Sequence, residues 1–333
     1  MNANRGQVRS AIAASLLGLV GGTLVGCTNP ASDSNATNVS MRSQEDTELD
    51  SVAVTVGDLS NPFFVVMAQG AEQEAKKIAG DDVRVTVVSS GYDLNQQFNQ
   101  IENFVASDTD VIVLNAADSK GIRPAVDNAR AAGSVVVAVD TGVDAEVDAT
   151  VTTNNVQAGE KSCQYIADRL NGKGNVVIVN GPPVTSVIER VDGCLSVLDK
   201  YPDLKILSKD QNAEGSRDGG LRVMTDLLTT FPNIDAVFAI NDPSGVGADL
   251  AANQAKRDDF FIVGVDGAPE AIEAIASEDS IYAATATQDP RGMAQTAVRV
   301  GNKVLKGEKL ESKDILIPVK LITEENVDTA EGW

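Results

Sequence analysis

The chain contains no histidine in 333 residues. This absence excludes the Ser-His-Asp and Cys-His catalytic arrangements, the HExxH zinc motif and imidazole general bases. Only three cysteines and one tryptophan are present, and a few thiolates without histidine make a poor basis for a zinc site. We therefore predict no enzyme, no catalytic residues, no cofactor and no metal site.

Glycine motifs that bind nucleotide phosphates are also missing. No GxGxxG follows a strand, because Leu250 stands where a third glycine after Gly245 and Gly247 is required, and no GxxxxGK occurs. The run that begins at Asp93 resembles a calcium loop, but Phe98 stands where such a loop needs glycine. Basic charge is scarce as well: the net charge is −21, which repels phosphate backbones and argues against a nucleic-acid partner.

The N-terminal residues carry an export signal. Residues 1–27 combine early basic residues with the apolar run 11–25, which is too short for a comfortable membrane span and is typical of a secretory signal peptide. The end of this segment resembles a bacterial lipobox, which implies that Cys27 receives a lipid; an ordinary signal peptide with an incidental cysteine is the alternative. Residues 28–49 are polar and lack apolar periodicity, so we expect a flexible tether. Together these features predict export to the periplasm or cell surface, with lipid anchoring to a membrane.

One pattern recurs through the rest of the chain: a short apolar strand that ends on Asn or Asp. Runs of Val and Ile without alternation indicate parallel strands that are buried on both faces. Ligands of such sheets bind outside the carboxyl ends of the strands, so the pattern would deliver planar polar side chains to a binding site. These residues could also serve only as helix caps and turn formers. The strand-ending residues are Asn115, Asp140, Asn180, Asn241 and Asp266.

The length of the chain and the alternation of strands and helices predict two wound α/β units in series. The strand–helix rhythm runs from residue 52, includes a helix over 119–132, restarts near residue 175 and closes with a strand near 315–322. Cys163 and Cys194 fall on predicted helices that flank one strand, so a disulfide between them is sterically possible. Two buried free thiols are the alternative.

Several segments carry a family resemblance, and they include NPFF at 61–64, LNAADSKGI, ERVDGC, VFAINDP, IVGVDGAPE, ATATQDP and VLKGEK. Together they resemble the type I periplasmic sugar-binding proteins of ABC importers, of the ribose-binding class. The resemblance implies two Rossmann-like, doubly wound lobes joined by a three-segment hinge. It would assign residues 50–153 plus 289–318 to the N-terminal lobe and 154–288 plus 319–333 to the C-terminal lobe.

The same resemblance implies a set of ligand-binding residues. Asn and Asp side chains, an Arg and a Gln can each bond neighbouring sugar hydroxyls, and aromatic rings can stack on the C–H face of a sugar. Phe63 and Phe64 could instead be core residues, and Arg190 could be a surface cation. The implied set is Asn61, Phe63, Phe64, Asn115, Asp140, Arg190, Asn241, Asp266 and Gln288.

The sequence departs from the ribose-binding pattern at two positions. Thr141 follows Asp140 where ribose binders carry an arginine, and Gly215 falls where they carry a second-lobe aromatic residue. The resemblance as a whole implies a monomeric, non-enzymatic substrate-binding protein that captures a monosaccharide-like small molecule and delivers it to an ABC permease and its ATPase. The alternatives are a sensory or chemotaxis receptor of the same fold, a binder of a non-sugar polar molecule, and a glycosidase that uses Asp140 and Asp266.

Overall fold

The structure is a computed structural model that describes residues 48–330 and 332–333. The expected signal peptide, the expected lipidation residue Cys27 and most of the expected tether lie outside the described residues. Leu49, the last residue of that expected tether, belongs to the folded body, because its side chain is 3% exposed and packs in a hydrophobic core. Within the described part of the chain, no helix has the length and apolarity needed to cross a membrane.

The first lobe is built on a six-stranded parallel sheet with the order β11-β5-β4-β3-β1-β2. Its strands are β1 (Ser51–Val56), β2 (Arg84–Ser89), β3 (Val111–Leu114), β4 (Val135–Val139), β5 (Ala149–Thr153) and β11 (Asp314–Ile317). Its helices are α1 (Pro62–Ala79), α2 (Leu94–Ala106), α3 (Arg123–Ala131) and α9 (Pro290–Leu305).

The second lobe has its own six-stranded sheet, ordered β12-β10-β9-β8-β6-β7, in which only the edge strand β12 pairs antiparallel. Its strands are β6 (Lys173–Asn180), β7 (Asp203–Asn212), β8 (Ala236–Ala239), β9 (Phe261–Asp266), β10 (Tyr282–Thr287) and β12 (Leu321–Thr323). Its helices are α4 (Asn155–Arg169), α5 (Thr185–Leu198), α6 (Arg217–Thr230), α7 (Asp242–Ala255), α8 (Pro269–Ile275) and the short 3₁₀ helix Val327–Thr329.

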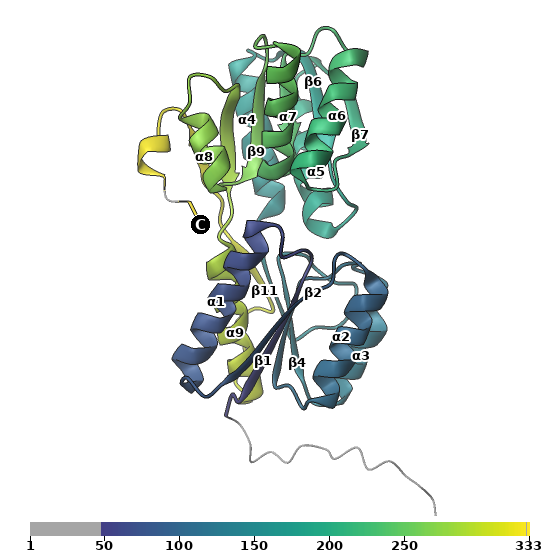
Figure 1. The fold of residues 1–333 in the computed structure, drawn as a ribbon, viewed down its shortest axis with the longest axis vertical. Coiled ribbons are helices and arrows are strands. Elements are labelled where there is room, and N and C mark those ends of the chain that lie inside the picture. The colour runs from purple at the N-terminus through teal and green to yellow at the C-terminus, as the bar shows by residue number, and fades with distance from the viewer. Residues whose placement is uncertain (1–47, 331) are drawn as a thin grey trace, which may run out of the picture. The chain divides into compact units, whose positions relative to one another are not determined.

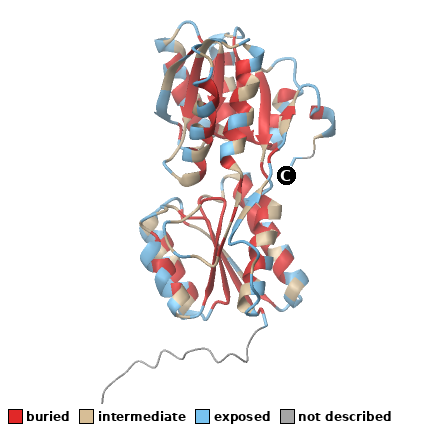
Figure 2. Cartoon of the chain, turned by 180° about the vertical axis from the view of Figure 1, so that it is seen from behind, coloured by how far each residue is buried: buried red, intermediate tan, exposed pale blue. Residues whose placement is uncertain are grey.

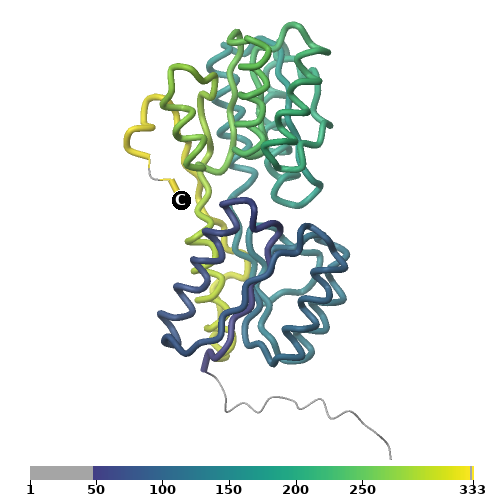
Figure 3. The backbone as a smooth tube through the Cα atoms, viewed as in Figure 1, coloured from purple at the N-terminus to yellow at the C-terminus, as the bar shows by residue number. Residues whose placement is uncertain are grey.

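Helices cover both faces of each sheet, which is why the central strands read as continuous apolar runs. In the first lobe α1 and α9 lie on one face and α2 and α3 on the other (Figure 1). The central strands of both sheets are buried, whereas the edge strands β2, β7 and β11 and the outer sides of the helices are partly exposed (Figure 2). Although about 210 residues separate them in sequence, α1 and α9 pack side by side (Figure 3). The prediction of two doubly wound α/β lobes is therefore confirmed.

The chain passes between the two sheets at three places. One passage follows β5, a second follows β10 and a third lies between β11 and β12. The sequence predicted a single strand near 315–322, and this is wrong. Residues 314–317 pair with β5 in the first sheet and residues 321–323 pair with β10 in the second, with Pro318 between them. Proline cannot donate a ladder hydrogen bond, so a strand break at this position is expected.

The predicted helix over 119–132 begins later than expected. Asp118 does not cap it; its carboxylate accepts hydrogen bonds from the backbone N–H groups of Lys120 and Gly121, at 2.9 and 2.6 Å, and forms a turn. The helix α3 starts only at Arg123, followed by a proline in its first turn. An Asp side chain that closes a local turn competes with helix capping, which the sequence pattern alone does not resolve.

Helices α4 and α5 approach each other closely enough that two glycines are required. A Cβ atom on Gly159 would lie 1.9 Å from the carbonyl oxygen of Arg190, and one on Gly193 would lie 2.2 Å from that of Val156. Cys163 and Cys194 meet between these helices, with their Sγ atoms within bonding distance. This tight helix pair fixes the position of Arg190, which α5 carries.

Candidate functional site

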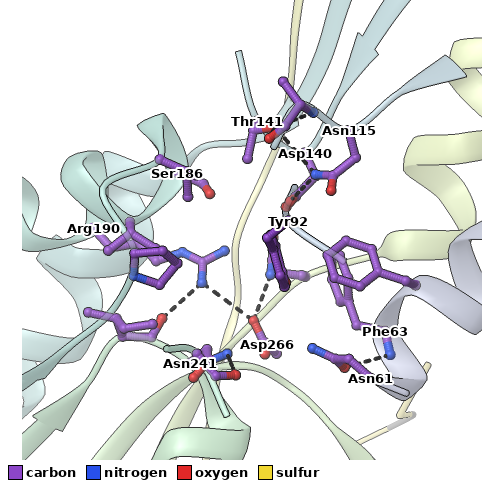
Figure 4. Close-up of a pocket in the computed structure, with 18 residues that line it drawn as sticks. Asn61, Phe63, Tyr92, Asn115, Asp140, Thr141, Ser186, Arg190, Asn241 and Asp266 are labelled. Carbon is purple, nitrogen blue, oxygen red and sulfur yellow. Dashed lines mark hydrogen bonds and ion pairs between the residues drawn. The ribbon is translucent and has the colours of Figure 1, made fainter. Parts of the chain in front are cut away.

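Residues of both lobes line one cavity of about 60 Å³, here called the inner cavity (Figure 4). It lies at the carboxyl ends of β3, β4, β8 and β9. All the side chains expected from the sequence to bind ligand line it, namely Asn61, Phe63, Phe64, Asn115, Asp140, Arg190, Asn241, Asp266 and Gln288. Of the strand-ending polar residues only Asn180 is absent from this lining, so the expectation that it reaches the site is wrong. Its side-chain amide instead donates to the carbonyl oxygen of Lys209 on the neighbouring strand, at 2.9 Å.

The first lobe contributes a linked pair of polar side chains. Asn115 accepts a hydrogen bond from the N–H of Gly57 at 3.0 Å and donates to the Asp140 carboxylate at 3.0 Å. Thr141 accepts from the N–H of Ala116 at 3.1 Å. Asp140 has a φ of 63° and is 7% exposed. This left-handed backbone turns its carboxylate away from the strand direction and toward Asn115, so the two side chains hold one another in place.

The same lobe supplies the aromatic surface. Asn61 caps α1 by accepting from the N–H of Phe63 at 3.0 Å, which places Phe63 and Phe64 in the first turn. Both rings are about 5% exposed and meet edge to face with centroids 5.3 Å apart. The ring of Tyr92, just after β2, lies 6.3 Å from that of Phe64. The capping geometry therefore accounts for how an Asn-Pro-Phe-Phe segment brings two rings to the cavity.

The second lobe contributes a buried cation. The guanidinium of Arg190 is held by two contacts: it donates to the side chain of Asn155 at 2.9 Å and to the carbonyl oxygen of Ile240 at 2.8 Å. Its Nη1 lies 3.6 Å from the carboxylate of Asp266 (Figure 4). The Arg190 and Asp266 side chains are 5% and 4% exposed. Arg190 is therefore a preorganised group of the cavity, and the surface-cation interpretation is wrong.

Two further amides, those of Asn241 and Gln288, line the cavity. Asn241 caps α7 by accepting from the N–H of Ser244 at 3.1 Å, and its amide donates to the carbonyl oxygen of Gly215 at 2.9 Å. Gln288, in the second passage between the sheets, donates to the carboxylate of Asp266 at 2.6 Å and accepts from Thr153 at 2.8 Å. Gln288 thus ties the end of β5 in the first lobe to the end of β9 in the second.

Burial raises the pKa of both acids of the cavity. Desolvation raises the pKa of Asp140 to about 6, although Arg190 and the Asn115 hydrogen bond oppose the shift. For Asp266 desolvation, against the opposing charge of Arg190, raises the pKa to about 8. An acid that keeps its proton near neutral pH can donate as well as accept hydrogen bonds. The cavity therefore offers both donors and acceptors to a neutral polar molecule.

The sequence did not point to all of the lining residues. Tyr92, Ser186 and Val184 also line the cavity. Tyr92 lies three residues beyond the end of β2, whereas Asn115 directly follows β3, so the pattern of strand-ending polar residues did not include Tyr92. Ser186 and Val184 lie around the start of α5, where no pattern distinguishes them from ordinary helix residues.

These contacts define the class of protein: a two-lobed receptor whose cavity presents planar polar groups and aromatic edges to a small polar solute. Among the described residues no cluster of three or more acidic or thiol side chains is arranged to hold a metal ion. The family model described as "Periplasmic binding protein domain" matches residues 52–309. The chain belongs to this family. Its members are solute receptors that do not catalyse reactions, and membership implies export.

Individual relatives agree with this assignment. The chain is 34% identical over 275 residues to the ribose import binding protein of Bacillus subtilis, covering 82% of this chain and 87% of the relative. It is 32% identical over 282 residues to a xylitol-binding protein of Mycolicibacterium smegmatis, covering 84% and 78%.

Solved structures show the same fold. A Caulobacter myo-inositol binding protein bound to myo-inositol matches with a TM-score of 0.78 and 28% identity, covering 85% of this chain and 96% of that one. The fructose-binding periplasmic domain of the hybrid two-component system BT1754 matches with a TM-score of 0.77 and 25% identity, covering 84% and 92%.

Proposed function

We propose that this protein is the substrate-binding component of an ABC-type sugar importer. It captures a monosaccharide-like solute in the inner cavity and delivers it to a membrane permease that works with an ATPase. The side chains expected from the sequence supply the ligand contacts, and Tyr92 adds a third aromatic ring to the pair Phe63 and Phe64. Relatives named for ribose, xylitol and myo-inositol support a polyhydroxylated ligand.

The observation that carries the proposal is the convergence of amides, acids and one guanidinium beside aromatic edges. Each planar polar group can bond two adjacent hydroxyls, which suits sugars and polyols better than ligands with isolated polar atoms. Arg190 is held by Asn155 and Ile240, so it needs no reordering when ligand arrives. A micromolar dissociation constant corresponds to about −8 kcal/mol, which some ten hydrogen bonds and one or two stacked rings can supply after ordering costs.

The mechanism is ligand-coupled closure of the two lobes about the three passages of the chain. The N–H of Gly142 in the first lobe donates to the hydroxyl of Thr185 in the second at 2.8 Å, which supports direct contact between the lobes beside the cavity. A ligand that bonds both lobes favours the closed arrangement, and the permease distinguishes this arrangement from the open one.

The lipobox-like end of the export signal supports lipid attachment of the receptor to a membrane through Cys27. The proposed receptor acts as a monomer. A sensory role is the second candidate, because the fructose-binding domain of a two-component system shares the fold. The two roles use the same cavity. Deletion of a permease gene next to the gene of this protein would distinguish them, because loss of growth on the ligand indicates transport and not signalling alone.

Thermal melting of residues 28–333 against pentoses, hexoses, ketoses, polyols and nucleosides tests the proposal. A ligand at about 100 times its dissociation constant should add roughly 2.7 kcal/mol and raise the midpoint by several degrees. One clear hit names the solute. If no compound of the panel raises the midpoint, the sugar assignment is wrong and non-carbohydrate ligands become the candidates.

A further inference from the structure

A second cavity of about 490 Å³, here called the outer chamber, adjoins the inner cavity. Asn61, Tyr92 and Gly215 line both, so the two spaces meet along a shared boundary. At Gly215 no side chain stands in the way, and a Cβ atom there would lie 3.4 Å from its nearest neighbour, the amide of Asn241. At Gly215 the boundary therefore lacks the aromatic side chain that the resemblance to ribose binders implies at this position.

The walls of the outer chamber have their own chemistry. Pro243, Val246 and Trp333 contribute apolar surface. The indole of Trp333 packs edge to face on Phe63 at 5.6 Å and donates to the carbonyl oxygen of Asp266 at 2.9 Å, which fixes it as a wall between the lobes. A rigid apolar wall beside a sugar site suits a ring or chain attached to that sugar.

The rim of the chamber is acidic. The carboxylates of Asp58, Glu214 and Glu270 line it, whereas Arg217 is the only basic side chain among its described lining residues. Arg217 is already 3.7 Å from Glu270. An anionic group in the chamber would lie beside these carboxylates, and like charges repel each other. The chamber therefore disfavours phosphates and carboxylates and accepts neutral or cationic groups.

We propose that the physiological ligand is a glycoside. Its sugar ring occupies the inner cavity, and a neutral or cationic apolar group linked to that ring occupies the outer chamber. This proposal rests on the proposed function, because it needs a sugar in the inner cavity. The inner cavity, at about 60 Å³, is much smaller than the adjoining chamber, at about 490 Å³, so a group attached to the sugar ring has its room in the chamber.

Calorimetric titration of the full chain with matched ligand pairs tests the proposal. The pairs are ribose with adenosine, and xylose, glucose and galactose each with its phenyl β-glycoside; the 4-carboxyphenyl glycosides serve as charge controls. We expect one free sugar to bind and its neutral glycoside to bind at least tenfold tighter, because the added group buries apolar surface. The carboxyphenyl glycoside should lose that gain.

Val246 lines the outer chamber but not the inner cavity, so Val246→Trp fills the chamber while every residue that lines the inner cavity keeps its identity; Val246→Ile is the matched control. The tryptophan variant should abolish the tenfold gain while the free sugar binds within twofold of the parent protein. Glu270→Trp narrows the same space from an exposed position and keeps the test informative if Val246→Trp folds poorly.

The outcomes separate the two proposals. If a free sugar binds as tightly as its glycosides and neither tryptophan substitution changes any affinity, the glycoside proposal is wrong and the sugar-binding function stands. Failure of every free sugar and every glycoside to bind overturns the sugar-binding function and this proposal with it.

Discussion

Arg190 is the only cation among the described residues that line the inner cavity, and it faces two acids. Its fork-shaped guanidinium already donates to Asn155 and Ile240 and lies near Asp266, so it presents a fixed direction of approach to ligand hydroxyls. A lysine would keep the charge but not this geometry. Substitutions of Arg190 can therefore separate the effect of its charge on ligand binding from the effect of its geometry.

We predict that Arg190→Met weakens ligand binding about 100-fold or more, because charge-assisted hydrogen bonds contribute about 1.5 to 3 kcal/mol each. Arg190→Lys should cost less, about tenfold, since it keeps the cation. Calorimetric titration of the two variants measures the difference. Equal, small losses in both would show that ligand does not contact this side chain.

The acids predict a pH dependence of stability with a definite sign. The pKa of Asp140 is raised to about 6 in the folded protein from an ordinary value of 3.8, so the folded chain holds a proton there that the unfolded chain has lost. Its stabilising contribution is complete below about pH 4 and disappears as the pH rises through about 6. The raised pKa of Asp266, about 8, extends the same trend toward neutral pH.

Asp140→Asn should therefore flatten the fall in unfolding free energy between pH 4 and 6, where one proton corresponds to at most about 1.4 kcal/mol per pH unit. Urea unfolding at several pH values measures the slope for the variant and the parent protein. Identical slopes would mean that Asp140 titrates normally in the folded state.

At the scale of elements, the α4–α5 pair connects stability to the site. Gly159 and Gly193 let the helix backbones approach, the two cysteines lie between them, and α5 carries Arg190 to the cavity. A crosslink over 31 residues restricts the unfolded chain more than it changes the folded one.

Replacing both Cys163 and Cys194 with alanine should lower the free energy of unfolding by about 3 to 4 kcal/mol. Urea unfolding with and without dithiothreitol checks this, and the reductant should destabilise the parent protein but leave the double variant unchanged. A parent protein that is indifferent to reductant, with two thiols titratable after unfolding, would show that the thiols are free.

Much of the fold was predictable at this scale, because strands such as Val111–Leu114 are apolar throughout and helices such as α1 and α7 begin with clear side-chain caps. Local competition between hydrogen-bond partners was not predictable. Asp118 closes a turn in place of capping α3, and Asn180 bonds the neighbouring strand β7 in place of reaching the cavity. Tyr92 lines the cavity with a left-handed backbone conformation, at a φ of 58°, which the sequence pattern did not predict.

At the scale of the whole molecule, binding depends on how readily the lobes close. The hydrogen bond from the N–H of Gly142 to the hydroxyl of Thr185 joins the lobes beside the cavity, and neither residue lines the inner cavity. Its loss should therefore shift the lobe equilibrium without removing a ligand contact.

We predict that Thr185→Val weakens ligand binding about fivefold, the equivalent of roughly 1 kcal/mol for one hydrogen bond. Thr185→Ser keeps the hydroxyl and should bind like the parent protein. Calorimetric titration of both variants tests this, and a valine variant that binds normally would remove Thr185 from the closure mechanism.

The most direct test of the central claim is a calorimetric titration of the panel's best sugar into the parent protein and into Asn241→Ala. The account predicts one site per chain with a micromolar dissociation constant, and at least a tenfold loss in the variant, because Asn241 lines the inner cavity from the second lobe. Equal affinity in both proteins, or no heat with any sugar, would contradict a sugar site between these lobes.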